Sequence, residues 1–271
     1  MNVFKFEIKR LLKSGIVWGV VNGLLVLLFM LFFPSMEKSG LQKVFEAELK
    51  SFPEGLMEAF GIDMGIDFTN ISEYLAYVIQ YIAMASGVYA IILGVNSLIK
   101  EETEGSIEFL YAQPIRRRTI VTNKLASNAT IYALYLVILW AITALSCAAV
   151  KPDDTALAEV LKDVSYIILG MGFTGYVFMA VGFALSTVVR SSKGAVPMAM
   201  SVFFVTFIMG VLGKLKENLG FFKYLSPFEY ASPSEVIRNG VELVNLSLGG
   251  IIILLGITVT YYLYERKDMR I

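Results

Sequence analysis

Hydrophobic residues gather along the chain in six long windows that contain no aspartate, glutamate, lysine or arginine. Every window holds roughly 20 residues or more, the length that a helix needs to cross the hydrocarbon core of a bilayer. None shows the period-two alternation of a strand in an outer-membrane barrel. The pattern predicts an all-α integral membrane protein, one transmembrane domain over residues 1–271. Its six predicted transmembrane helices cover residues 14–36, 74–99, 125–150, 164–189, 194–213 and 243–264.

The segment before the first window, residues 1–13, has an amphipathic pattern of its own. Lysines surround an apolar face at helical spacing, and that face is formed by Val3, Phe4, Ile8, Leu11 and Leu12. Such a pattern predicts an N-terminal helix that lies in the membrane interface. A cleaved signal peptide is the alternative, but the residues after the window offer no small-residue cleavage site and the apolar run is long. We therefore expect the first window to be retained as a transmembrane helix.

Basic residues are distributed unevenly over the segments that connect the windows. Of the 23 lysines and arginines, 14 lie in the N-terminal segment, the second and fourth connections and the C-terminal segment. Connections rich in lysine and arginine stay on the cytoplasmic side of a membrane. The count predicts a multi-pass protein of the cell membrane with both termini in the cytoplasm.

The composition argues against catalysis by this chain. Hydrophobic residues make up 56% of the 271 positions, histidine is absent and there is one cysteine. Histidine is the commonest general base near neutral pH and a common metal ligand. The one Gly-Lys pair, Gly213-Lys214, is followed by leucine and so lacks the pattern of a phosphate-binding loop. We expect no catalytic residue, no metal site and no cofactor on this chain, and we expect any ATP to be hydrolysed by another subunit.

Three glycines form a stripe along the first window, because Gly15, Gly19 and Gly23 recur every four residues. Small residues at this spacing let the backbone of another helix approach closely. The stripe predicts packing either against another helix of this chain or against a second subunit, and the pattern favours neither.

The connection between the second and third windows, KEETEGSIEFLYAQPIRRRTI, is the most charged part of the chain. Ser106 can begin a short helix there, because serine is a good N-cap, and Pro114 ends it. Within that helix Ile107, Leu110 and Tyr111 form an apolar face of two turns. Such a face is too small to make its own core, and its size fits a groove on a partner.

An arginine triplet, residues 116–118, follows this short helix. Basic side chains at the cytoplasmic start of a transmembrane helix commonly bind anionic lipid headgroups. We expect Arg116, Arg117 and Arg118 to bind headgroups or to anchor the loop.

The connection EETEGSIEFLYAQPIRRRTI resembles the cytoplasmic loop of ABC-transporter permeases of the six-helix exporter type, also called type-2 or type V exporters. Two further segments, FPEGLMEAFGI after the first window and YLSPFEY before the last, are similar to outer segments of that family. The order and placement of the three segments carry the resemblance, which covers nearly the whole chain.

The resemblance implies that two permease subunits, as a homodimer or a heterodimer, form a transmembrane core above two ATPase subunits. ATP and Mg²⁺ would bind to the ATPase subunits, and the permease would contact membrane lipid and no nucleic acid. A cytoplasmic coupling helix over about 104–113 would receive the movement of the ATPase. The residues expected to serve this coupling are Glu101, Glu102, Glu104, Gly105, Ser106, Ile107, Glu108, Phe109, Leu110, Tyr111 and Pro114.

The expected function is that of the permease subunit of an ATP-driven exporter. The alternative is a non-transporting membrane sensor or scaffold whose cytoplasmic loop docks a regulatory partner. A membrane-embedded enzyme ranks third, because the sequence contains no histidine and no carboxylate pair within the windows. The family exports drugs, peptides, lipids and polysaccharides, and nothing in this sequence selects among these cargos.

Overall fold

The structure is a computed structural model that describes residues 3–38, 57, 66–104, 116–189, 191–215 and 217–267. These residues form helices and contain no strand. Six of the helical segments among them are long and apolar enough to cross a membrane. The prediction of an all-α protein with six transmembrane helices is confirmed.

In the described part of the chain, six long helices overlap the six uncharged windows, and four shorter elements lie between them. In chain order the elements are α1 (Val3–Met30), α2 (Phe33–Lys38), α5 (Ile71–Glu104), α7 (Arg117–Val150), α8 (Leu157–Ser186), α9 (Ser192–Leu215), the 3-10 helices η1 (Glu217–Leu225) and η2 (Pro227–Glu229), α10 (Pro233–Asn239) and α11 (Leu243–Arg266).

Several helices extend beyond the windows that predicted them. α5 continues through the acidic residues after its window to Glu104, and α7 begins at Arg117 rather than near residue 125. Lysine, arginine and glutamate are good helix formers, so a helix continues where the apolar pattern stops. An uncharged window therefore indicates the apolar part of a transmembrane helix but does not give the ends of the helix.

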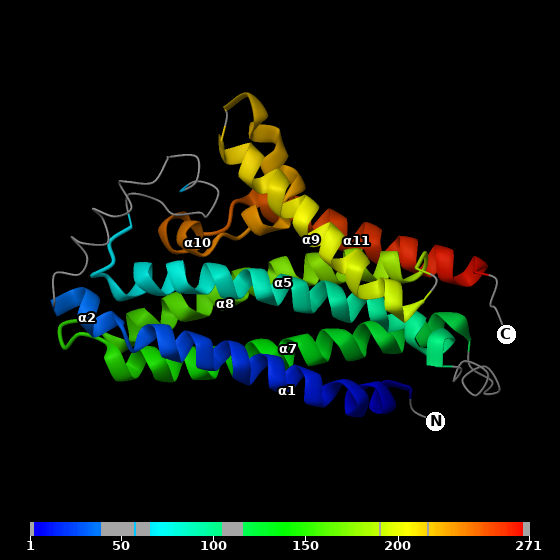
Figure 1. Ribbon diagram of the computed structural model, residues 1–271, viewed down its shortest axis with the longest axis horizontal. Helices are drawn as coiled ribbons and strands as arrows, with labels where there is room; N and C mark the ends of the chain where they lie inside the picture. The colour runs from blue at the N-terminus through cyan, green and yellow to red at the C-terminus, as the bar shows by residue number, and fades with distance from the viewer. Residues whose placement is uncertain are drawn as a thin grey trace.

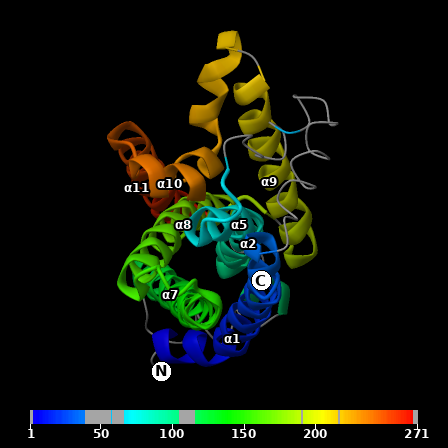
Figure 2. The ribbon, with the colours of Figure 1, turned by 90° about the vertical axis from the view of Figure 1, so that its left-hand side faces the viewer.

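Of the expected interfacial segment, residues 1–13, the described part (residues 3–13) belongs to α1 and is not a separate helix. α1 runs from Val3 to Met30 as one element, because no proline separates the amphipathic turns from the apolar ones. Figure 2 shows that its first turns bend aside from the rest of the helix.

The bundle has α5 and α8 at its centre. About two thirds of the most apolar stretch of each is buried, 67% for α5 and 72% for α8, against 17% for α11 and 22% for α9. α1 packs along α7, and α11 packs on α8. Figure 1 shows α1, α5, α7 and α8 side by side along the long axis, with both chain termini at the same end.

Two glycines let α5 and α8 meet backbone to backbone. A Cβ atom at Gly182 would lie 2.6 Å from the carbonyl oxygen of Ile91, and one at Gly94 would collide with the carbonyl oxygen of Met179. No side chain fits in these positions, so the central pair of helices depends on both glycines.

The segment between α9 and α11 folds into η1, η2 and α10. η1 packs against α9, whereas α10 packs against α5 and α8 at the end of the bundle away from the chain termini (Figure 1). Pro227 and Pro233 begin η2 and α10, where a proline needs no hydrogen bond from its nitrogen.

Candidate functional site

The first three turns of α7 contact three other helices at the end of the bundle that carries both chain termini. Their side chains bond to the beginning of α1, to the last turns of α5 and to the end of α11. We call these turns, residues 117–128, the α7 junction. The α7 junction directly follows the segment in which the coupling helix was predicted.

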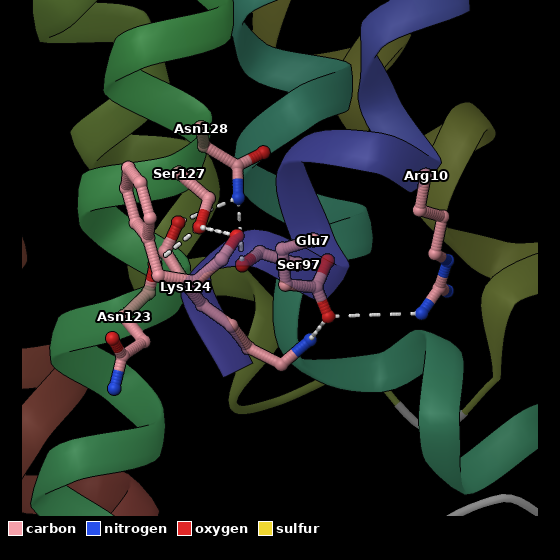
Figure 3. Close-up of polar contacts among 8 residues, drawn as sticks. Glu7, Arg10, Ser97, Asn123, Lys124, Ser127 and Asn128 are labelled. Atoms are coloured by element: carbon pink, nitrogen blue, oxygen red, sulfur yellow. Dashed lines mark hydrogen bonds and ion pairs between the residues drawn. The ribbon is translucent and has the colours of Figure 1, made fainter. Parts of the chain in front are cut away.

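A buried ion pair joins the α7 junction to α1. The Lys124 ammonium donates a hydrogen bond to Glu7 Oε1 at 2.9 Å, and the side chains of Lys124 and Glu7 are only 2% and 6% exposed. Arg10 lies 3.7 Å from the same oxygen on the next turn of α1. Figure 3 shows Lys124 and Arg10 reaching this carboxylate from two sides. Two opposite charges buried at this distance hold the start of α1 against α7.

Amide and hydroxyl groups extend this network to α5. Asn128 Nδ2 donates to Ser97 Oγ at 3.3 Å, and both side chains are buried. Ser127 Oγ donates to the carbonyl oxygen of Phe4 at 3.4 Å, which adds a second bond between α7 and α1. Figure 3 shows these groups one turn beyond the ion pair.

Two arginines of the predicted triplet bind the end of α11. Arg117 Nη1 donates to the carbonyl oxygens of Glu265 and Lys267, at 3.0 Å each. The last carbonyls of a helix have no partner within the helix, so a guanidinium there satisfies them and complements the helix dipole. Arg118 forms an ion pair with the Glu265 carboxylate through Nε and Nη2. Arg116 is exposed immediately before α7.

The expected coupling residues lie mostly outside the described residues. Glu101, Glu102 and Glu104 belong to the last turn of α5. The segment with Gly105, Ser106, Ile107, Glu108, Phe109, Leu110, Tyr111 and Pro114 falls between the described ranges 66–104 and 116–189. The structure thus gives the two ends of this segment, which are the end of α5 and the α7 junction.

The glycine stripe of α1 packs against α7. Cβ atoms at Gly15 and Gly19 would lie 2.9 and 3.0 Å from Ile131 and Ile138, and one at Gly23 would lie 2.5 Å from Ile142. Of the two alternatives given by the sequence, the structure shows packing within the chain. This packing continues the contact between α1 and α7 that begins at the ion pair.

An aromatic cluster occupies the middle of the contact among α1, α5 and α7. Trp18 stacks on Tyr89 with 4.9 Å between the ring centroids, and Tyr89 lies 5.3 Å from Tyr135. Asn22 Nδ2 donates to the Tyr135 hydroxyl at 3.0 Å, so this intramembrane amide serves an interhelical hydrogen bond. Tyr132 stacks on Tyr135 and shares a 2.6 Å hydrogen bond with the serine hydroxyl at position 86 of α5.

Sequence reasoning missed the ion pair, although two signals were present. Glu7 is the one acid among the basic residues of the segment 1–13, and Lys124 directly precedes an uncharged window.

The hydrogen bonds and ion pairs of the α7 junction connect helices to one another mechanically. Within the ranges that the structure describes, no three His, Cys, Asp or Glu side chains come together as metal ligands.

Comparison with known proteins identifies a family and a similar protein. The sequence pattern of the family described as "ABC-2 family transporter protein" matches residues 1–269. A similar protein is the "Probable ABC transporter permease protein NosY" of Stutzerimonas stutzeri, which is 24% identical over 187 residues. That alignment covers 67% of this chain and 66% of the relative, so the chain aligns with slightly less than two thirds of the relative's length.

Proposed function

Since the chain belongs to the ABC-2 transporter family and is the permease subunit of an ABC transporter, we propose that it forms the membrane part of an exporter and is driven by a separate ATPase subunit. In this proposal the ATPase docks on the segment 105–115, whose apolar face of two turns suits a groove on a partner. Two permease subunits form the path, and ATP with Mg²⁺ binds to the ATPase subunits.

The observation that carries this proposal is the α7 junction. Lys124, Asn128 and Arg117 connect the residues just after the docking segment to α1, α5 and α11 respectively. A displacement of the docking segment therefore reaches three membrane helices through short bonds. Contiguous sets of packed and hydrogen-bonded groups of this kind carry coupling between distant sites in proteins.

Docking is tested by purifying the tagged permease in mild detergent from cells that express it at its own chromosomal locus. We expect an ATP-binding-cassette subunit to co-purify with the permease. Leu110→Asp places a charge on the apolar face and should abolish co-purification, whereas the matched control Leu110→Met should retain it. Full co-purification with the Asp variant would refute docking at this face.

Transmission through the α7 junction is tested by hydrogen exchange on the purified complex. Addition of a non-hydrolysable ATP analogue with Mg²⁺ should change amide protection at residues 117–128, at the start of α1 and at the end of α11. A change confined to residues 105–115 would show that the ATPase binds there without moving the helices.

The cytoplasmic location of both termini is part of the proposal, and it is supported by the excess of lysine and arginine on the segments of that side. It is tested with a single cysteine at an exposed loop position, Asp154, in a Cys147→Ser background. A membrane-impermeant maleimide should label this cysteine in intact cells. Labelling only after lysis would show that Asp154 lies on the cytoplasmic side and that the orientation is the opposite of the one proposed.

A further inference from the structure

A pocket lies among α5, α8, α9 and the loop that joins η1 to η2. Its lining is mainly apolar, with methionines at positions 84 and 171 and two aromatic rings, Phe207 and Phe228. About 580 Å³ of it is free of atoms, the open mouth included, and the enclosed part has room for a group the size of a few water molecules. Ligand sites commonly combine such an apolar lining with a few polar groups.

Thr174 lines this pocket, and its buried hydroxyl has no hydrogen-bond partner among the described residues. A threonine in a helix can donate to the carbonyl oxygen four residues earlier. Thr130, Thr206 and Thr260 do so here, at distances of 2.6 to 2.9 Å. Thr174 forms no such bond although its side chain is only 5% exposed. Its hydroxyl is thus left for a partner in the pocket.

Ser226 lines the same pocket, and its hydroxyl also has no partner in the described part of the chain. Ser226 immediately precedes η2, where a serine side chain often accepts a backbone hydrogen bond, yet it forms none. The residue is fully buried. Thr174 and Ser226 therefore line one pocket from different elements. Each has a buried hydroxyl that lacks the backbone hydrogen bond usual for its position in the chain.

The charges that line the pocket cancel each other. Lys214 Nζ lies 2.8 Å from Glu229 Oε1, and these two residues are the charged residues of the lining. An ion pair offers no net charge to a ligand, so the transfer of an anion or a cation from water into the pocket is not favoured. Hydroxyls can both donate and accept hydrogen bonds, which suits an uncharged alcohol, carbonyl or amide.

We propose that this pocket binds the uncharged polar group of a small amphiphile. The polar group bonds to Thr174 and Ser226, and the aliphatic part lies in the mouth against Phe207 and Phe228. The site lies within one chain, and its occupancy does not depend on transport or on an ATPase.

The test is photolabelling of the full-length protein in lipid nanodiscs with a diazirine analogue of 1-octanol, followed by mass spectrometry of the adducts. We expect adducts to concentrate on Phe207, Phe228 and Met84. Unlabelled 1-octanol should compete at these positions, whereas octane at the same mole fraction in the bilayer, or glycerol in the buffer, should not. Competition by octane equal to that by octanol would show an apolar crevice without a polar site and would overturn the proposal.

Two variants assign the polar contacts. Thr174→Val and Ser226→Ala should each lower labelling in the pocket by about five- to tenfold, which corresponds to the loss of one hydrogen bond. The matched control is Thr143→Val, because Thr143 is also a fully buried threonine without a partner among the described residues, but it does not line the pocket. Labelling of the exposed face of α11, for example at Leu254, provides the reference for intact folding. Pocket labelling unchanged in both variants would refute the assignment.

Discussion

The buried pair of Glu7 and Lys124 allows a quantitative test of how α1 is held to α7. We consider Glu7→Gln, Lys124→Met and the double variant, all of which roughly preserve side-chain volume. Each single change removes one charge from a pair whose side chains are 6% and 2% exposed. The double change removes both charges of the pair and leaves the partly exposed Arg10 as the neighbouring ion.

The expected magnitudes follow from the geometry. Two unit charges 2.9 Å apart attract each other by about 6 kcal/mol at an effective dielectric constant of about 20. Desolvation of the two ions offsets most of this attraction, so the net contribution of the intact pair is small. Removing one partner leaves the other ion desolvated without that attraction, which costs up to about 3 to 5 kcal/mol. Lys124→Met should cost less than this upper value, because Arg10 still lies 3.7 Å from the Glu7 carboxylate. The double variant should cost no more than either single variant.

The free energy of unfolding is measured for the four proteins in mixed micelles of a mild detergent and sodium dodecyl sulfate. A double-mutant cycle should give a coupling energy of at least about 2 kcal/mol between the two positions. The exposed pair of Arg118 and Glu265 supplies the control, because solvent-exposed ion pairs contribute little. If the costs of Glu7→Gln and Lys124→Met add within about 0.5 kcal/mol, the pair does not act as a unit and the reasoning is wrong.

Three further predictions concern other contacts of the bundle. Gly182→Ala should destabilise the fold by about 2 kcal/mol or more, because the added carbon would lie 2.6 Å from a backbone oxygen. The control Gly250→Ala should be tolerated, because Gly250 has open space around it. The midpoints of thermal unfolding of the two variants test this difference. Tyr135→Phe should cost about 1 to 2 kcal/mol by the same measurement, because the buried amide on α1 loses its acceptor. Arg117→Gln should increase hydrogen exchange at the last turn of α11 and leave the rest of the fold protected. The control Arg116→Gln changes an exposed residue and should leave hydrogen exchange unchanged throughout. Equal exchange at the end of α11 in both variants would contradict the role of Arg117.

The six transmembrane helices could be predicted from the sequence because charged residues are excluded from the apolar part of a bilayer. The partner of the glycine stripe could not, since Gly15, Gly19 and Gly23 permit close approach by any helix. The structure identifies α7 through Ile131 and Ile138. Spacing along one helix thus predicts that a contact surface exists and does not predict what covers it.

The candidate site was predictable in part. The segment in which the sequence predicts a coupling helix stands out by its charge and its short apolar face, and this prediction falls outside the described residues. The structure describes the residues on either side of the segment, which are the end of α5 and the α7 junction. The bonds of the α7 junction depend on residues far apart in the chain, such as Lys124 with Glu7 and Arg117 with the carbonyl oxygens of α11. No local pattern encodes such pairs, because each partner alone has the signature of an ordinary charge at a membrane edge.

The ion pair also sets an order for biogenesis. Glu7 and Lys124 are 117 residues apart, and chains are synthesised at about 5 to 20 residues per second, so the carboxylate waits about 6 to 23 s for its ammonium. Until then Glu7 has Arg10 beside it at 3.7 Å but lacks its closer partner, and burial of the carboxylate would cost more than in the finished bundle. The first turns of α1 are therefore expected to stay at the membrane surface until α7 inserts. On this reasoning α1 reaches its final depth only after α7 has joined it.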